Sequence, residues 1–165
     1  MAYVLADPEE IREKYEMDIG SKNTYPSSAL SNFAPHPFEY DGVQCASMEG
    51  FLQSLKFKDQ NMQEEVCKLV GIKAKNKGRK KNWYTTQTLY WKGNPIQRDS
   101  QEYQDLLTGA YDALFENDSF KKALTAAGDC TFTHSIGKRK IEETVLTQRE
   151  FCSQLNRLRL KLKII

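Results

Sequence analysis

The sequence has little that would carry it into or across a membrane. None of its apolar runs approaches the roughly 20 residues that a membrane-spanning helix needs. Its first ten residues have neither the basic start nor the long apolar stretch of a secretory signal peptide. We therefore expect a cytoplasmic protein with no membrane partner.

Ligands for a metal ion are also scarce. The 165 residues include 2 histidines, and the 4 cysteines form no Cys-x-x-Cys pair. Zinc ligands usually come in closely spaced pairs, so the sequence predicts neither a metal site nor a cofactor. Because a chain of this length can bury enough apolar surface to fold without covalent cross-links, we expect the cysteines to be reduced.

What the sequence does contain is the composition of a folded domain. Hydrophobic residues make up 39% of it, and 24 lysines and arginines against 22 acidic residues give a net charge of +2. This composition excludes intrinsic disorder, and it lacks the domain-wide basic excess of tight nucleic-acid binders. The length predicts a single domain over residues 1–165.

Helical periodicity and capping signals predict an α+β fold that is predominantly helical, with about six helices. The expected helices cover residues 7–17, 47–57, 61–71, 99–115, 120–127 and 147–158. The dipeptide Asp41-Gly42 favours a tight hairpin between residues 38–40 and 43–45. Residues 130–133 have the composition of a further strand. We expect the β part to be a small antiparallel element.

The expected helix over residues 47–57 places Glu49, Gln53 and Lys56 on one line, because their spacing follows the helical repeat. One interpretation is the solvated face of an amphipathic helix. The other is a site in which an acid, an amide and an ammonium group act together. Gly50 favours close packing by a ligand or a neighbouring backbone, since glycine costs about 1 kcal/mol in a helix relative to alanine.

Residues 73–81 carry six cations, including Arg79, and are followed by Trp83 and Tyr84. Such a segment suits phosphate groups next to a stacked base. It equally suits a loop whose charges only keep the protein in solution. The sequence leaves both interpretations open.

Three later residues are also candidates for a site. Trp91 either stacks on a base or packs in the core. Arg98, in the same turn-rich segment, has the geometry to pair with a phosphate. His134 lies in a basic loop, where it is either a proton donor or a structural residue.

Two segments together resemble a known family. One is residues 29–42, Ala-Leu-Ser-Asn-Phe-Ala-Pro-His-Pro-Phe-Glu-Tyr-Asp-Gly. The other is the helix motif formed by Ser47, Glu49, Gln53, Lys56 and Phe57. They resemble the YbiA-like, or NADAR, family, in which Ser/Thr-x-Glu-x-x-x-Gln-x-x-Lys-Phe recurs. The end of the chain is similar to one branch of that family, so the resemblance covers most of residues 24–160. Many relatives carry histidine where this chain has Gly50.

The resemblance implies a YbiA-like fold and an N-glycosidase that hydrolyses the bond between ribose C1′ and a nitrogen. The implied substrates are a phosphoribosylaminopyrimidine of riboflavin synthesis or ADP-ribosylated guanine, free or in nucleic acid. The alternative is a module that binds ADP-ribose or a nucleotide without turnover, which the glycine in place of histidine suggests. Breaking the bond develops positive charge on the sugar, so a carboxylate beneath the sugar stabilises the transition state.

On this hypothesis Glu49 is the catalytic carboxylate, and Asp129 is a weaker candidate for a second acid. Lys56 either holds a phosphate or hydroxyl group, or attacks C1′ and forms an imine. The remaining candidates are expected to bind the substrate's ribose, base and phosphate groups: Ser31, Asn32, Phe33, Gln53, Arg79, Trp91, Arg98 and His134.

Overall fold

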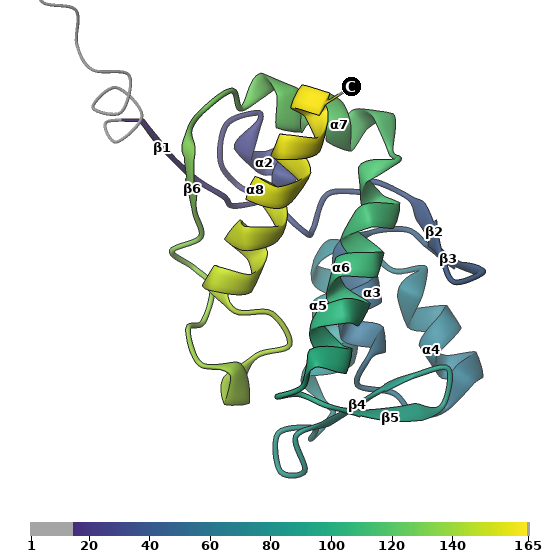
Figure 1. The fold of residues 1–165 in the computed structure, drawn as a ribbon. Coiled ribbons are helices and arrows are strands. Elements are labelled where there is room, and N and C mark those ends of the chain that lie inside the picture. The colour runs from purple at the N-terminus through teal and green to yellow at the C-terminus, as the bar shows by residue number, and fades with distance from the viewer. Residues whose placement is uncertain (1–14, 165) are drawn as a thin grey trace, which may run out of the picture.

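The computed structural model describes residues 15–164, which are mainly helical (Figure 1). Within that range it has seven α-helices, one short 3-10 helix and three two-stranded sheets. The helices are α2 (Ser27–Leu30), α3 (Met48–Ser54), α4 (Gln60–Cys67), α5 (Gly71–Arg79), α6 (Gln101–Phe115), α7 (Asp118–Ala126), η1 (Ile141–Glu143) and α8 (Gln148–Ile164). The strands are β1 (Glu16–Asp18), β2 (Phe38–Tyr40), β3 (Val43–Cys45), β4 (Thr88–Trp91), β5 (Asn94–Gln97) and β6 (Thr131–Thr133). The expected α+β, predominantly helical fold is confirmed.

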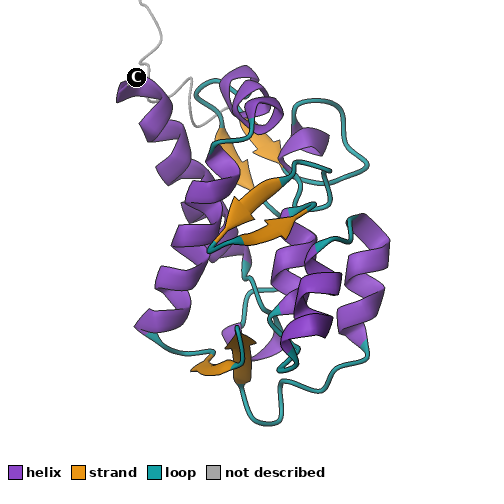
Figure 2. Cartoon of the chain, turned by 90° about the vertical axis from the view of Figure 1, so that its right-hand side faces the viewer, coloured by secondary structure: helices purple, strands orange, loops and turns teal. Residues whose placement is uncertain are grey.

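Two of the sheets are hairpins with the same kind of turn (Figure 2). Asp41 and Gly42 join β2 to β3 with φ angles of 51° and 78°, as the Asp-Gly pair predicts. Lys92 and Gly93 join β4 to β5 with φ angles of 51° and 81°. The composition of residues 88–97 does not predict this second hairpin, because it includes a proline and few alternating apolar residues.

The third sheet differs from the expectation in direction. Strand β1 pairs with β6 in parallel, with Met17 opposite Phe132, whereas only antiparallel pairing was expected. The expected helix over residues 7–17 is wrong at its end, since Glu16 and Met17 are in β1. Residues 7–14 lie outside the described part of the chain.

The segment after α3 holds two helices where one was expected. Asp59, rather than Asn61, caps α4 by accepting a hydrogen bond from Met62 N at 2.8 Å, and α4 ends at Cys67. Gly71 does not end that helix but begins α5. The basic run is therefore helical up to Arg79 rather than a loop.

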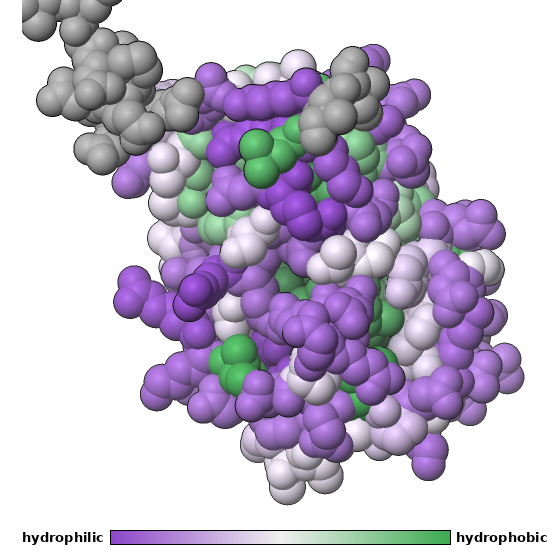
Figure 3. All heavy atoms as spheres, in the orientation of Figure 1, coloured by the Kyte–Doolittle hydropathy of each residue, from purple (hydrophilic) through white to green (hydrophobic). Residues whose placement is uncertain are grey.

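Helix α6 forms the centre of the molecule, between α8 on one side and α3 on the other (Figure 1). Helix α3 packs in turn against α4 and α5. The capping box of α8 is confirmed: Thr147 N donates to Glu150 Oε1 at 2.8 Å, and Glu150 N donates to Thr147 Oγ1 at 3.1 Å. Figure 3 shows a mainly hydrophilic surface with a few small hydrophobic areas, some recessed and some protruding, as expected when most apolar residues fill one core.

The cysteines of this core are free thiols, three of them buried and Cys152 partly exposed. No helix among residues 15–164 has the length and apolar character needed to cross a membrane.

Candidate active site

Glu49 lies in the first turn of α3, where two segments of the chain meet. Ser47 caps the helix by accepting a hydrogen bond from Gly50 N at 3.0 Å. Glu49 N donates to Asn32 O at 2.9 Å, which joins the loop of residues 31–34 to the helix. Glu49 is 9% exposed and Gln53 is 6% exposed. The interpretation of this line as a solvated face is therefore wrong for these two residues.

Gln53 holds the carboxyl of Glu49 from one turn further along. Its Nε2 donates to Glu49 Oε1 at 2.8 Å. Its Oε1 is the one buried side-chain polar atom of residues 15–164 with no hydrogen-bond partner. A Cβ at Gly78 would lie 1.8 Å from that oxygen, so α5 needs a glycine there. A buried carbonyl oxygen without a hydrogen-bond partner costs about 1–3 kcal/mol. The site therefore favours a ligand that donates a hydrogen bond to Gln53 Oε1.

Gly50 has a different neighbour. A Cβ at this position would lie 2.5 Å from Leu69 O and 2.8 Å from Cys67 O. A neighbouring backbone, rather than a ligand, therefore requires the glycine. Position 50 faces the connection between α4 and α5, whereas Gln53 faces Gly78.

Lys56 follows α3 and is half-buried, with Nζ 3.5 Å from Gly78 O. Burial lowers the pKa of Lys56 to about 8, although Glu49 acts in the opposite direction. Three other cations lower this pKa further, and they come from α5 and from the loop after β6: Lys138, Arg79 and Lys75. An amine in this position exists in both protonation states near neutral pH.

Burial also raises the pKa of Glu49, and this effect exceeds the opposing effects of Gln53, Lys75 and Lys56. A carboxyl with a raised pKa beside an ammonium with a lowered pKa is typical of acid–base or nucleophilic sites. Among residues 15–164, no three His, Cys, Asp or Glu side chains are grouped to hold a metal ion.

The loop of residues 31–34 forms another wall of the site. Tyr111 Oη donates to Asn32 Oδ1 at 2.8 Å, and Tyr111 is fully buried. Phe33 is half-buried, and Lys75 Nζ lies 6.0 Å from the centre of its ring. Ser31 Oγ accepts a hydrogen bond from Phe33 N at 3.2 Å, which fixes the turn. The Leu-Ser-Asn-Phe stretch is thereby held beside Glu49.

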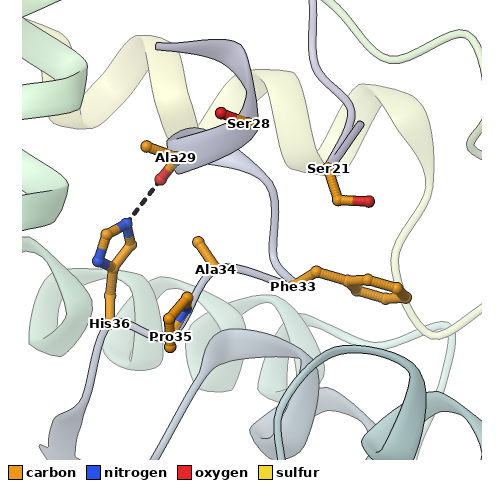
Figure 4. A pocket seen from close by; sticks show the side chains of 7 residues that line it. All are labelled: Ser21, Ser28, Ala29, Phe33, Ala34, Pro35 and His36. Carbon is orange, nitrogen blue, oxygen red and sulfur yellow. Dashed lines mark hydrogen bonds between the residues drawn. The ribbon is translucent and has the colours of Figure 1, made fainter. Parts of the chain in front are cut away.

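Phe33 also borders a surface hollow of about 340 Å³ (Figure 4). The other lining residues come from the segment before α2, from α2 itself and from the loop after it: Ser21, Ser28, Ala29, Ala34, Pro35 and His36. His36 Nε2 donates to Ala29 O at 2.7 Å, so this histidine holds the loop. Glu49 is not among the residues that line this hollow.

Trp91 lies away from this group. Its ring packs against Phe51 and Tyr40, at 5.3 and 5.4 Å between ring centres, and its Nε1 donates to Asp41 Oδ2 at 2.9 Å. Phe51 is two residues from Glu49 and so faces the opposite side of α3. The structure therefore places Trp91 in the core, one of its two interpretations.

Arg98 is engaged in a buried ion pair. It is 1% exposed, its Nε donates to Thr144 O at 2.8 Å, and its Nη1 donates to Glu150 Oε2 at 3.0 Å. His134 Nδ1 donates to Ile19 O at 2.8 Å. The structure does not bring Arg98 together with Glu49.

Asp129 is exposed and pairs with Lys163 Nζ at 3.2 Å, near the end of α8. Arg79 is exposed on α5 and acts on Lys56 electrostatically. The predicted residues that the structure gathers around Glu49 are thus Asn32, Phe33, Gln53, Lys56 and Arg79.

Three residues of this group were not predicted as site residues. Lys75 was one cation of the basic run, Tyr111 was assigned to the core alone, and Gly78 was not singled out. The four-residue spacing of Ala74 and Gly78 within the run is the signal for a helix with a small, closely packed face. No sequence pattern distinguishes Tyr111 from the other buried aromatic residues.

Comparison with known proteins agrees with this arrangement of segments. The family described as "Bacteriophage protein GP30.3" matches residues 24–160, which include Asn32, Glu49 and Lys56. The chain belongs to this family. A relative of this GP30.3-family chain in Enterobacteria phage T4 is an uncharacterized 17.1 kDa protein from the Gp30–rIII intergenic region. It is 41% identical over 150 residues, which are 87% of this chain and 97% of the phage protein.

The fold is that of the Escherichia coli protein YbiA. The NMR structure of YbiA matches 91% of this chain and 86% of its own with a TM-score of 0.61, at 18% sequence identity. The resemblance drawn from the Leu-Ser-Asn-Phe stretch and the α3 motif is therefore confirmed for the fold.

Proposed function

We propose that this chain is an N-glycosidase that hydrolyses a bond between ribose C1′ and nitrogen in a ribose-phosphate or ADP-ribose-type substrate. The observation that carries the proposal is the buried carboxyl of Glu49, held by Gln53 and flanked by Lys56 and Lys75. Few structural roles require an acid at this depth with a single hydrogen-bond donor. The YbiA fold and the matching α3 motif support the same conclusion.

The reaction assigns one task to each group. Heterolysis of the bond sends its electron pair to the base nitrogen and leaves positive charge on C1′ and O4′. The Glu49 carboxylate stabilises this charge more than it stabilises the ground state. Water then adds to C1′, Glu49 accepts the proton that the water loses, and that proton passes to the released base. Asn32 binds a ribose hydroxyl through its amide nitrogen, because Oδ1 is occupied by Tyr111.

Lys56 has two possible tasks. As an ammonium it holds a phosphate or hydroxyl group of the substrate. As an amine it attacks C1′, displaces the base and forms an imine with the opened sugar, which water then releases. A nucleophilic lysine needs a depressed pKa, which the sequence alone could not show. The pKa of about 8 for Lys56 therefore adds support for the second task.

The alternative of a binding module without turnover had one argument, the glycine in place of histidine. Gly50 faces the Leu69 carbonyl and leaves the side of α3 that carries Gln53 unchanged. This position therefore gives no reason to prefer a module over an enzyme.

The test is a mass-spectrometric screen for base release from phosphoribosylaminopyrimidines and ADP-ribosylated guanosine. We expect Glu49→Gln to lose at least about a hundredfold in rate, the low end for a lost charge-stabilising group. Glu65→Gln is the matched control, an isosteric change at an exposed glutamate of α4, and we expect it to keep the full rate. Saturable binding with no product from any conjugate would establish the module instead.

The dependence of kcat/KM on pH separates the two tasks of Lys56. If Lys56 acts as an ammonium, kcat/KM falls as pH rises through about 8, because the charge is lost. If Lys56 attacks as an amine, kcat/KM rises through the same pH. Borohydride added during turnover traps a covalent adduct at Lys56 only in the second case.

A further inference from the structure

Helix α5 and the residues after it carry a strip of cations that form no ion pair with the acidic residues of the described chain. The strip consists of Lys73, Lys75, Lys77, Arg79, Lys80 and Lys81, all exposed. The α8 cations Arg157, Lys161 and Lys163 pair with Asp112 or Asp129, for example Lys161 with Asp112 at 2.6 Å. These three cations are neutralised locally, whereas those of the strip are available to an anion from outside.

The packing of α5 explains why the whole strip is exposed. The helix buries only Ala74 and Gly78, and through them it lies close against α3. Six cations on so short a segment repel one another, which costs stability unless a polyanion binds. The protein keeps this arrangement although alternating acids would remove the repulsion.

An aromatic side chain follows the strip. Trp83 is buried, but Tyr84 is 62% exposed. Tyr84 lines a hollow of about 400 Å³ together with Lys138, Glu142 and Glu143. Gln87 Nε2 closes the back of this region by donating to Tyr84 O at 2.8 Å and to Glu142 O at 3.0 Å.

A second group of cations borders the hollow. Residues 138–140 are Lys-Arg-Lys, and all three are exposed. Lys138 lines the hollow, and it acts electrostatically on Lys56 together with Arg79 and Lys75 of the strip. Glu142 and Glu143 are the acids of the hollow, and they accept hydrogen bonds from the amino groups of a base or the hydroxyls of a ribose. The surface therefore combines cations from two segments with an exposed aromatic ring and hydrogen-bond acceptors.

We propose that α5, Tyr84 and residues 138–140 form a docking surface for single-stranded nucleic acid. The strand's phosphates lie on the two groups of cations, and one base stacks on Tyr84 above the two glutamates. An acidic peptide would satisfy the cations but would leave the ring unused and would be repelled by Glu142 and Glu143. The net charge of +2 predicts micromolar rather than tight affinity, with the attraction confined to this surface.

The test is fluorescence anisotropy of a labelled, unmodified single-stranded DNA of about 12 nucleotides, titrated with the full chain between about 50 and 200 mM salt. We expect affinity to fall steeply with salt. The double variant Lys77→Gln/Lys80→Gln should lower the slope of log K against log salt by about 1.4, since each lost phosphate contact removes about 0.7. The same charge change on α7, Lys121→Gln/Lys122→Gln, should leave affinity and slope unchanged.

Tyr84→Ala should weaken binding by about 5- to 100-fold, as expected for one lost base stack, and Tyr84→Phe should keep it. Equal affinity for heparin together with no effect of Tyr84→Ala would overturn the proposal, and so would equal losses from the α5 and α7 variants. No binding of DNA with turnover of free nucleosides would refute the docking surface alone. Binding with no turnover of any conjugate would refute the glycosidase and leave the surface.

Discussion

Two glutamates of this protein lie at the starts of helices, largely removed from water, and their surroundings differ. Glu150 in α8 receives hydrogen bonds from Arg98, from Gln104 Nε2 at 2.6 Å and from Thr147 N at 2.8 Å. Although burial raises the pKa of Glu150, these donors lower it below its ordinary value. Glu49 in α3 receives one side-chain hydrogen bond, from Gln53, and its pKa is raised.

The difference separates a structural carboxylate from a reactive one. Glu150 has its oxygens occupied by donors and a buried cation in contact, so it fastens α8 to the segment before α6 and has little capacity left for a ligand. Glu49 has one oxygen that receives no hydrogen bond from residues 15–164, and its neighbouring cations act at a longer range, so its charge is costly until a positive group arrives. Burial alone would not have distinguished the two.

The largest effect is expected when the structural pair is broken. Arg98→Met should lower the free energy of unfolding by about 3–5 kcal/mol, because it leaves the charge of Glu150 buried without its partner. Urea denaturation measures this loss, with Arg149→Met as the control at an exposed position of α8, next to Glu150 in the sequence. The deficit should shrink as pH falls below about 4.5, where Glu150 takes up a proton. A deficit below 1 kcal/mol would show that the ion pair resembles a surface pair.

The next effect concerns the contact between α3 and α5. Gly78→Ala would place a Cβ 1.8 Å from Gln53 Oε1, so Gln53 must move and its bond to Glu49 must lengthen. We expect a loss of about 1–3 kcal/mol, typical of overpacking, although alanine favours helices over glycine. The rate of base release should fall as well, because Gln53 no longer holds Glu49 in place. Asn76→Ala, at an exposed position of α5, should be neutral for both measurements.

Local signals in the sequence predicted the elements that local interactions determine. Asp41-Gly42 specifies its hairpin through positive φ, and Thr147 and Glu150 specify the start of α8 through reciprocal hydrogen bonds. The basic helix α5 escaped prediction because its buried face consists of Ala74 and Gly78, which give no apolar periodicity. The parallel pair of β1 and β6 joins segments at opposite ends of the chain, which no local pattern can report.

The same contrast between local and long-range interactions applies to the candidate site. Glu49 and Gln53 lie in α3 and Lys56 in the turn directly after it, so their spacing was enough to predict that they lie together. Trp91 and Arg98 received ligand roles among their interpretations because their partners lie 50 and 52 residues away, at Asp41 and Glu150. A side chain with a distant partner has the same appearance in the sequence as one that awaits a ligand.

The smallest expected effect tests the raised pKa of Glu49 through stability. The folded state binds this proton more tightly than the unfolded state, whose carboxyl titrates near 4.5, so the contribution of Glu49 to stability is present below pH 4.5 and lost as pH rises through the raised pKa. Glu49→Gln removes the ionisable carboxyl and with it this loss of stability at higher pH. Its free energy of unfolding in urea should therefore exceed that of the natural chain at pH 7 to 8, and the advantage should vanish below pH 4.5. Glu65→Gln should show no such trend, and an advantage that grew toward low pH would mean that Glu49 is stabilised as a charge, like Glu150.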